Sequence, residues 1–281
     1  MEDWHGQHEQ SIENRESNFA WTLHRHVTQA LPDLLPGAIK PHKLKHVLDL
    51  YCRSGSWATD FALSYPGIPI TGIDMSASHI KSARQTTLGM GLTQLDFYEA
   101  DLTQPLCFQD QSFDLLHLFT TAPLFKPDEW QMLLRECWRV LEPGGRLNLV
   151  YLSHGPGTNE AHQRILLMLD QFWQQQGYVF AAMPVGSTPG LHFCSMLRQN
   201  NFTDILYHLY PINFGGPRNG SGRACSQFFL QRLQQMKSTI LASGVICKDE
   251  FDRIIMQQQQ EIISPSYCAT GVIISTLGTK R

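Results

Sequence analysis

Residues 47–64 constrain the fold of this chain more than any other stretch. The run that ends at Leu50 has the apolar character of a buried strand, and the segment from Ser56 to Ser64 has the character of a helix. Only a short turn, residues 51–55, separates them. A strand that passes through a short turn directly into a helix is typical of the opening unit of a doubly wound α/β domain, where a nucleotide-type cofactor lies at the turn.

Apolar runs and helical segments continue to alternate up to residue 152. Strands are expected at 46–50, 68–73, 95–99, 113–119 and 146–152, and helices at about 55–65, 76–88 and 128–141. The run 113–119 is almost wholly apolar, as expected for a strand that is covered on both faces. Pro143 and Gly144 end the last of these helices. The alternation predicts a mostly parallel sheet with right-handed crossovers.

The regular alternation ends after Ser153. One helix is expected before the first strand, at 11–31, and the second half should hold helices at 158–176, about 190–200, about 223–242 and 248–263, strands at 203–214 and 267–277, and a Gly/Pro-rich loop at 184–190. We therefore expect an N-terminal helical cap (1–43), a Rossmann-like core (44–153) and a remainder (154–281) that completes the sheet and adds helical lid insertions.

Composition excludes several classes of partner. The net charge is 22 − 25 = −3 and no run of Lys or Arg occurs, which argues against nucleic acid or an anionic membrane surface as a partner. No apolar stretch approaches the roughly 20 residues of a membrane span. The polar start of the chain is unlike a secretory signal. The 7 cysteines form no CxxC pair, so neither a disulfide framework nor a metal site is expected, and we predict a cytoplasmic protein.

Acidic residues recur where the predicted strands end. Asp49 lies inside the first strand, Asp74 ends the second and Asp101 follows the third. Ligands of open α/β sheets lie beyond the carboxyl ends of the strands, so these groups should gather at one site. An acid at the tip of the second strand can accept both hydroxyls of a ribose. The glycines do not fit the G-x-G-x-x-G pattern, which disfavours an NAD-dependent dehydrogenase.

The combination resembles the class I S-adenosylmethionine (SAM) methyltransferases, particularly the small-molecule branch of ubiquinone and menaquinone biosynthesis. The matching stretches, in order, are residues 47–55, 71–76, 99–101, 112–116 and 135–145. The resemblance covers about residues 44–152. It implies a Rossmann-like doubly wound sheet of seven strands whose last strand is antiparallel, with SAM as the cofactor and a SAM-dependent methyltransferase activity.

The resemblance also implies roles for individual residues. Asp49 and the turn would approach the methionine end of SAM, Asp74 would bind the ribose, and Asp101 with the Leu102 amide would recognise the adenine edge. Met75 would pack on the adenine, and Phe119 would border cofactor and acceptor. The predicted cofactor-binding set is therefore Asp49, Tyr51, Cys52, Arg53, Gly55, Asp74, Met75, Asp101, Leu102 and Phe119. For each acid, a helix cap or a solvated turn is the alternative interpretation.

Two residues depart from the family pattern, which has Gly or Ala at 51 and Gly at 53. Glycine suits these positions because the backbone must approach the ligand or adopt a positive φ. A positive φ at Arg53 would cost about 1 kcal/mol or more. Arg53 then either pairs with the carboxylate of SAM or of a substrate, or it fills the methionine subsite and abolishes binding. A tight turn that binds no ligand is the third alternative.

His154, directly after the fifth predicted strand, is the best-placed general base, and a plain loop histidine is the alternative. His117 and His192 are weaker candidates. Aromatic residues on the helices at 11–31, 158–176 and 223–242 would form a lid over an apolar acceptor: Phe19, Trp21, Phe172, Trp173, Phe228 and Phe229. We expect methyl transfer by in-line displacement to a small, largely apolar or aromatic metabolite, with a homodimer as the candidate assembly. A methyltransferase fold without methyl transfer, as a partner-binding subunit or a cyclisation or rearrangement enzyme, is the alternative.

Overall fold

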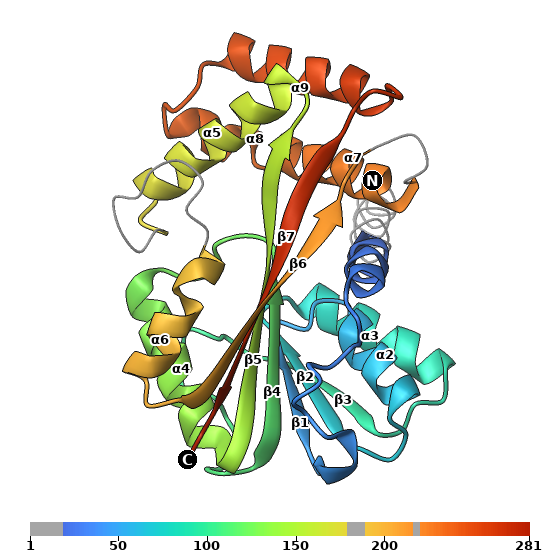
Figure 1. Ribbon diagram of the computed structural model, residues 1–281, viewed down its shortest axis with the longest axis vertical. Helices are drawn as coiled ribbons and strands as arrows, with labels where there is room; N and C mark the ends of the chain where they lie inside the picture. The colour runs from blue at the N-terminus through green and yellow to red at the C-terminus, as the bar shows by residue number, and fades with distance from the viewer. Residues whose placement is uncertain (1–18, 179–188, 216–219) are drawn as a thin grey trace, which may run out of the picture.

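One mixed β-sheet organises the molecule (Figure 1). The computed structural model describes residues 19–178, 189–215 and 220–281. The 7-stranded sheet has the order β3-β2-β1-β4-β5-β7-β6. Its strands are β1 (Val47–Leu50), β2 (Ile70–Asp74), β3 (Leu95–Glu99), β4 (Phe113–Thr120), β5 (Leu141–Gly157), β6 (Thr203–Asn213) and β7 (Ala269–Thr279). β1 to β5 pair in parallel, whereas β7 is antiparallel to both β5 and β6, which confirms the predicted fold class.

Helices cover both faces of this sheet. α2 (Ser56–Ser64) and α3 (Ala77–Gly89) lie on one face, and α4 (Pro127–Val140) and α6 (Phe193–Gln199) lie on the other (Figure 1). The remaining helices gather beyond the end of the sheet toward which β5 runs: α5 (Glu160–Gln175), α7 (Gly220–Gln235), α8 (Lys237–Ala242) and α9 (Lys248–Ile262). The short helices η1 (Pro41–Lys43) and η2 (Pro189–His192) and an N-terminal helix over residues 19–30 complete the described chain. No described helix is long and apolar enough to cross a membrane.

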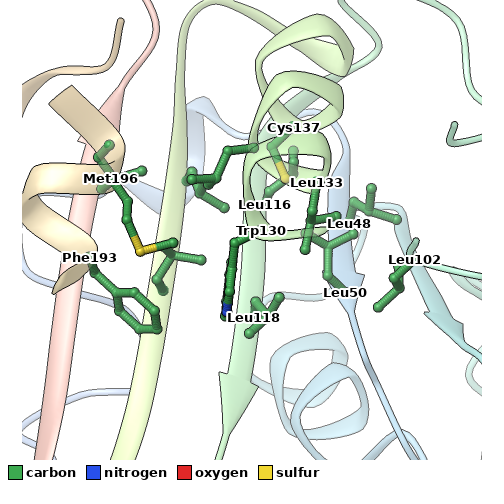
Figure 2. Close-up of a cluster of buried hydrophobic side chains, with 14 of the residues drawn as sticks. Leu48, Leu50, Leu102, Leu116, Leu118, Trp130, Leu133, Cys137, Phe193 and Met196 are labelled. Atoms are coloured by element: carbon green, nitrogen blue, oxygen red, sulfur yellow. The ribbon is translucent and has the colours of Figure 1, made fainter. Parts of the chain in front are cut away.

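The side chains of β1 alternate between the two faces of the sheet, so this short strand contributes to the hydrophobic clusters on both faces. Leu48 and Leu50 point into the cluster built by α4, where Trp130 and Leu133 pack on the sheet (Figure 2). Successive side chains of a strand point to opposite faces, so Val47 belongs to the cluster under α2 and α3. Asp49 therefore points, buried, to the α2 side. The carboxylate is thereby placed beneath the turn that follows β1.

β5 is longer than predicted, and this changes two interpretations. The expected turn at Pro143 and Gly144 lies within the strand, where the register with β4 shifts. At its other end β5 continues to Gly157 because β7 pairs with it as far as Ala269. His154 therefore lies inside the strand rather than after it. The predicted helix 223–242 is divided into α7 and α8. Residues 11–18 of the expected first helix and most of the loop at 184–190 lie outside the described residues.

Candidate active site

The turn between β1 and α2 has the positive φ angles that are typical of glycine, although two of the three residues that adopt them are not glycine. Tyr51 and Arg53 have φ of 59° and 53°, and Gly55 has 75°. Each non-glycine residue in the left-handed region costs about 1 kcal/mol. Arg53 thus has the positive φ whose cost the sequence analysis considered. Backbone bonds stabilise the turn: the Cys52 amide donates to the Ile73 carbonyl at 2.9 Å, and the Gly55 amide donates to the Cys52 carbonyl at 2.9 Å.

Gly55 is required for packing. A Cβ at this position would lie 2.7 Å from Cζ of Phe97 and 3.1 Å from Cβ of Ala83. A Cβ at Gly72 on β2 would also meet the ring of Phe97, at 2.5 Å. The two glycines thus let α2 and β2 close over one phenylalanine of β3. The glycine predicted to approach the ligand therefore fixes the start of α2 against the sheet.

Asp74 joins the turn to α3. Its carboxylate is buried and accepts from the Arg53 amide at 2.9 Å, from the Ser76 amide at 2.9 Å and from Nδ1 of His79 at 3.0 Å. The Arg53 bond explains how a non-glycine residue is held at positive φ. The His79 side chain is 26% exposed and lies over the carboxylate. His79 is a site residue that the sequence reasoning missed, although its position five residues after Asp74, on the first turn of a helix, was a usable signal.

The residues expected around the adenine have mixed environments. Met75 is exposed beside Asp74. Asp101 is also exposed, and its Oδ1 accepts from the Thr103 amide at 2.8 Å and from the Thr103 hydroxyl at 2.7 Å. These bonds lower the pKa of Asp101. The turn alternative thus accounts for these contacts of Asp101. The side chain of Leu102 is in the core, so only its backbone can meet a ligand.

Asp49 has the most unusual environment of the predicted set. Burial, together with the nearby charge of Asp74, raises its pKa well above the ordinary value, and Arg53 partly opposes this shift. Its Oδ2 is buried and has no hydrogen-bond partner among the described residues. A buried carboxylate oxygen without a partner is costly unless a ligand or water satisfies it.

A large cavity of about 710 Å³ adjoins the turn. Tyr51, Arg53 and His79 line it on the side of the turn, and residues 120–124 line it at the end of β4. The other aromatic side chains of its wall are Phe19, Tyr151, Trp173, Phe214, Phe228 and Phe229. Four of the expected lid aromatics are therefore brought together. Phe172 packs in the core instead, and Trp21 does not line this cavity.

His154 lies in the wall of the large cavity, stacked between two phenylalanine rings. Its ring centroid is 4.9 Å from that of Phe214 and 4.4 Å from that of Phe229. Burial, with a smaller contribution from nearby His162, lowers its pKa to about 4. The imidazole is therefore neutral at neutral pH and has a lone pair available to accept a hydrogen bond.

A small cavity of about 60 Å³ lies beneath the turn, between the sheet, the start of α2 and the N-terminal helix. It shares Ala20, Tyr51 and Arg53 with the large cavity. Phe119 and Cys52, both predicted cofactor residues, line this small cavity rather than the large one. The guanidinium of Arg53 lies over the rings of Tyr51 and Phe119, 5.1 and 5.7 Å from their centroids.

Sequence comparisons agree with this site. A methyltransferase domain family matches residues 47–145. A demethylmenaquinone methyltransferase of Lactiplantibacillus plantarum is 37% identical over 105 residues, 36% of this chain and 43% of that protein. An uncharacterized methyltransferase of Synechocystis is 27% identical over 164 residues, 58% of this chain and 69% of that protein. The chain spans less than half the length of the demethylmenaquinone methyltransferases that it matches first.

Solved structures share the fold. A provisionally assigned methyltransferase of Bacillus halodurans superposes with a TM-score of 0.52 at 17% identity, covering 94% of this chain and 99% of that one. The [4+2]-cyclase SpnF gives 0.50 at 21% identity over 84% of this chain and 75% of its own. The fold thus accommodates more than one reaction. Residues 47–145 match the methyltransferase domain family, and the sheet has the same fold as that solved structure from Bacillus halodurans.

Proposed function

We propose that this chain transfers the methyl group of SAM to a small, largely apolar acceptor. The observation that carries this proposal is the large, aromatic-lined cavity of about 710 Å³, which adjoins the cofactor turn through Tyr51 and Arg53. Binding sites for small molecules are apolar cavities of this size with a few polar groups. Bound there, SAM would supply a methyl group on a sulfonium that is already a good leaving group. The protein's task is then to position the acceptor and exclude water.

The residues around the turn fit this cofactor. Asp49 offers a buried carboxylate oxygen without a partner among the described residues, suited to the methionine end. Asp74 offers a carboxylate to the ribose, with His79 displaced from it. The exposed side chains of Asp101 and Met75 are suited to the adenine. Each of these roles is part of the proposal.

Arg53 is assigned to a carboxylate. Its guanidinium is held against two aromatic rings and lines both cavities, and no ion pair with it occurs among the described residues. A cation placed beside a sulfonium would be repulsive unless it paired with an anion. Guanidinium groups bind carboxylates in a bidentate manner. The carboxylate of the methionine end satisfies both conditions, which favours the cofactor-binding interpretation of Arg53 over the blocking one.

The acceptor is assigned from the walls of the large cavity and from the relatives. Stacked aromatic rings favour a flat, apolar molecule, and several relatives are demethylmenaquinone methyltransferases, which supports an aromatic quinol-type acceptor. His154 would accept a hydrogen bond from a hydroxyl group of the acceptor molecule. A proton that reached His154 would give an imidazolium between two phenyl faces, which stabilise a cation. Its lowered pKa makes it a weak base, so orientation of the hydroxyl is its main proposed role.

One observation favours a second candidate, a methyltransferase fold without methyl transfer. Arg53 stands where the family has glycine, and its guanidinium reaches into the shared wall of the two cavities. If the side chain occupies the methionine subsite, SAM does not bind, and the aromatic cavity serves a partner or a cyclisation or rearrangement instead.

Calorimetry with SAM and S-adenosylhomocysteine separates the two candidates. The wild-type chain should bind both, and Asp74→Asn should weaken binding by about 1.5–3 kcal/mol because a charged acceptor is lost. Arg53→Gly should also weaken binding. Arg53→Lys keeps the charge but not the bidentate geometry, so its affinity for SAM should lie between those of the wild type and of Arg53→Gly. Tighter binding by Arg53→Gly, or no binding by the wild type at millimolar ligand, would favour the second candidate. Transfer of labelled methyl from SAM to reduced hydroxynaphthoquinones then tests the acceptor class.

A further inference from the structure

A row of buried polar side chains crosses the centre of the sheet. Asp49 on β1, His117 on β4 and Asn148 on β5 are neighbours in the strand register, and all are buried, with exposures of 2%, 3% and 2%. Ser275 on β7 extends the row. Strand centres that are covered on both faces normally carry apolar side chains, so a polar row there needs a specific explanation.

Hydrogen bonds within the row fix the tautomer of His117. The Ser275 hydroxyl donates to Oδ1 of Asn148 at 3.1 Å, which leaves the Asn148 amide to donate to Nδ1 of His117 at 3.3 Å. Burial lowers the pKa of His117 to about 3, so its ring is neutral. A neutral ring that accepts at Nδ1 carries its hydrogen on Nε2. Trp57 stacks on the ring, with centroids 3.8 Å apart, and holds its plane.

Two atoms of the row have no hydrogen-bond partner within the described part of the chain. They are Nε2 of His117, a donor, and Oδ2 of Asp49, an acceptor when ionised, and both are fully buried. Asp49, His117, Asn148 and Ser275 all line the small cavity of about 60 Å³. One water needs about 15 Å³ of such space and at least two polar partners. The small cavity therefore offers both the space and the partners for water, whereas a nucleoside is far too large for it.

We propose that the small cavity is a hydration site in which ordered water joins Nε2–H of His117 to the carboxyl of Asp49, which makes His117 a positioning residue for that carboxyl. Water receives the hydrogen bond of His117 and passes one to Asp49. Asn148 and Ser275 keep the histidine in the donating tautomer. The Asp49 carboxyl is thereby oriented beneath residues 51–55. The consequence for SAM affinity rests on the proposed function, whereas the hydration site itself does not.

The hydration site is tested on the ligand-free, full-length protein labelled with ¹⁵N-histidine. The expected spectrum shows His117 as the neutral Nε2–H tautomer at pH 7, with magnetisation transfer from long-lived water to that proton. The Nδ1–H tautomer, or the absence of any water contact to the Nε2 proton, would overturn the proposal. This measurement needs neither a variant nor SAM.

The positioning role is tested by SAM calorimetry on three variants. His117→Phe keeps a flat ring that Trp57 can stack on but removes both nitrogens, and it should weaken SAM binding about tenfold. His117→Gln restores an N–H donor and should recover most of that loss. In an Asp49→Asn background His117→Phe should have little further effect, because its action passes through Asp49. Equal losses of SAM affinity in His117→Phe and His117→Gln would refute the positioning role. So would effects of His117→Phe and Asp49→Asn on SAM affinity that add fully in the double variant. If wild-type protein fails to bind SAM, the proposed function fails while the spectrum still decides the hydration site.

Discussion

At the scale of the residue, Asp74 and His79 determine whether the proposed ribose site is accessible. A carboxylate has about four lone-pair positions, and Asp74 already accepts from the Arg53 and Ser76 amides and from His79. Two ribose hydroxyls bring two more donors, so one present donor must leave. The amides belong to the turn and to the start of α3, whereas the imidazole can rotate because its side chain is partly exposed. In the proposed complex His79 is therefore the group that the ribose displaces.

We expect His79→Ala to tighten SAM binding about fivefold, or ~1 kcal/mol, a value kept small because the pair is partly exposed to solvent. His79→Gln is the matched control, because its amide can still donate to Asp74 and should leave affinity close to that of the wild type. Calorimetry at one pH and ionic strength measures both. Weaker binding by the alanine variant would mean that the imidazole contacts the cofactor instead of competing with it.

At the scale of the element, the sequence predicted what depends on local pattern and missed what depends on distant pairing. The apolar run of β4 and the acid that ends β2 are local signals, and both led to the right elements. The extension of β5 to Gly157 depends on its pairing with β7, far along the chain, so the position of His154 inside a strand could not be deduced locally. The position of His79 on the first turn of α3 was a usable signal that it lies near Asp74, whereas the hydrogen bond itself depends on a side-chain rotamer.

The packing of the C-terminal end of β5 depends on one close contact, between Gly157 and His162 of α5. A Cβ at Gly157 would lie 2.7 Å from Cδ2 of His162, a buried α5 residue whose Nε2 bonds the Gly155 carbonyl at 3.0 Å. Gly157→Ala should therefore lower the free energy of unfolding by about 1–3 kcal/mol through overpacking. Much of that loss should disappear when Gly157→Ala is added to a His162→Ala background, because the clashing ring is gone.

Urea unfolding of the two single variants and the double variant measures this coupling. Gly37→Ala is the control, because nothing lies within 4 Å of a Cβ at Gly37 and the φ of Gly37 lies outside the left-handed region. Additive effects of the Gly157 and His162 substitutions would show that the contact does not limit the packing of this strand end.

At the scale of the whole molecule, buried and half-buried histidines make stability depend on pH. Burial lowers the pKa of His117 to about 3 and that of His154 to about 4, and the pKa values of His26, His46 and His162 are lowered too. An unfolded histidine has a pKa of about 6.5. Between that pKa and the folded value, the unfolded chain binds the proton and the folded chain does not. The stability due to each histidine is complete above about pH 6.5 and is lost as the pH falls toward the folded pKa.

Asp49 acts in the opposite direction, because its raised pKa lets the folded chain keep a proton that the unfolded chain releases above about pH 4. Near pH 5.5, His117 and His154 together bind almost two protons more in the unfolded chain than in the folded chain, and a proton kept by Asp49 offsets at most one of them. The unfolding free energy should therefore fall by at least about 1 kcal/mol per pH unit of acidification, and the other histidines with lowered pKa values steepen the fall. Urea titrations at pH 6.0, 5.5 and 5.0 measure this slope. His154→Phe keeps a ring between Phe214 and Phe229 but removes one titrating group, so its slope should be smaller by about 1.4 kcal/mol per unit. If the variant and the wild type lose stability in parallel, His154 takes up its proton in the folded state and the burial argument for this site is wrong.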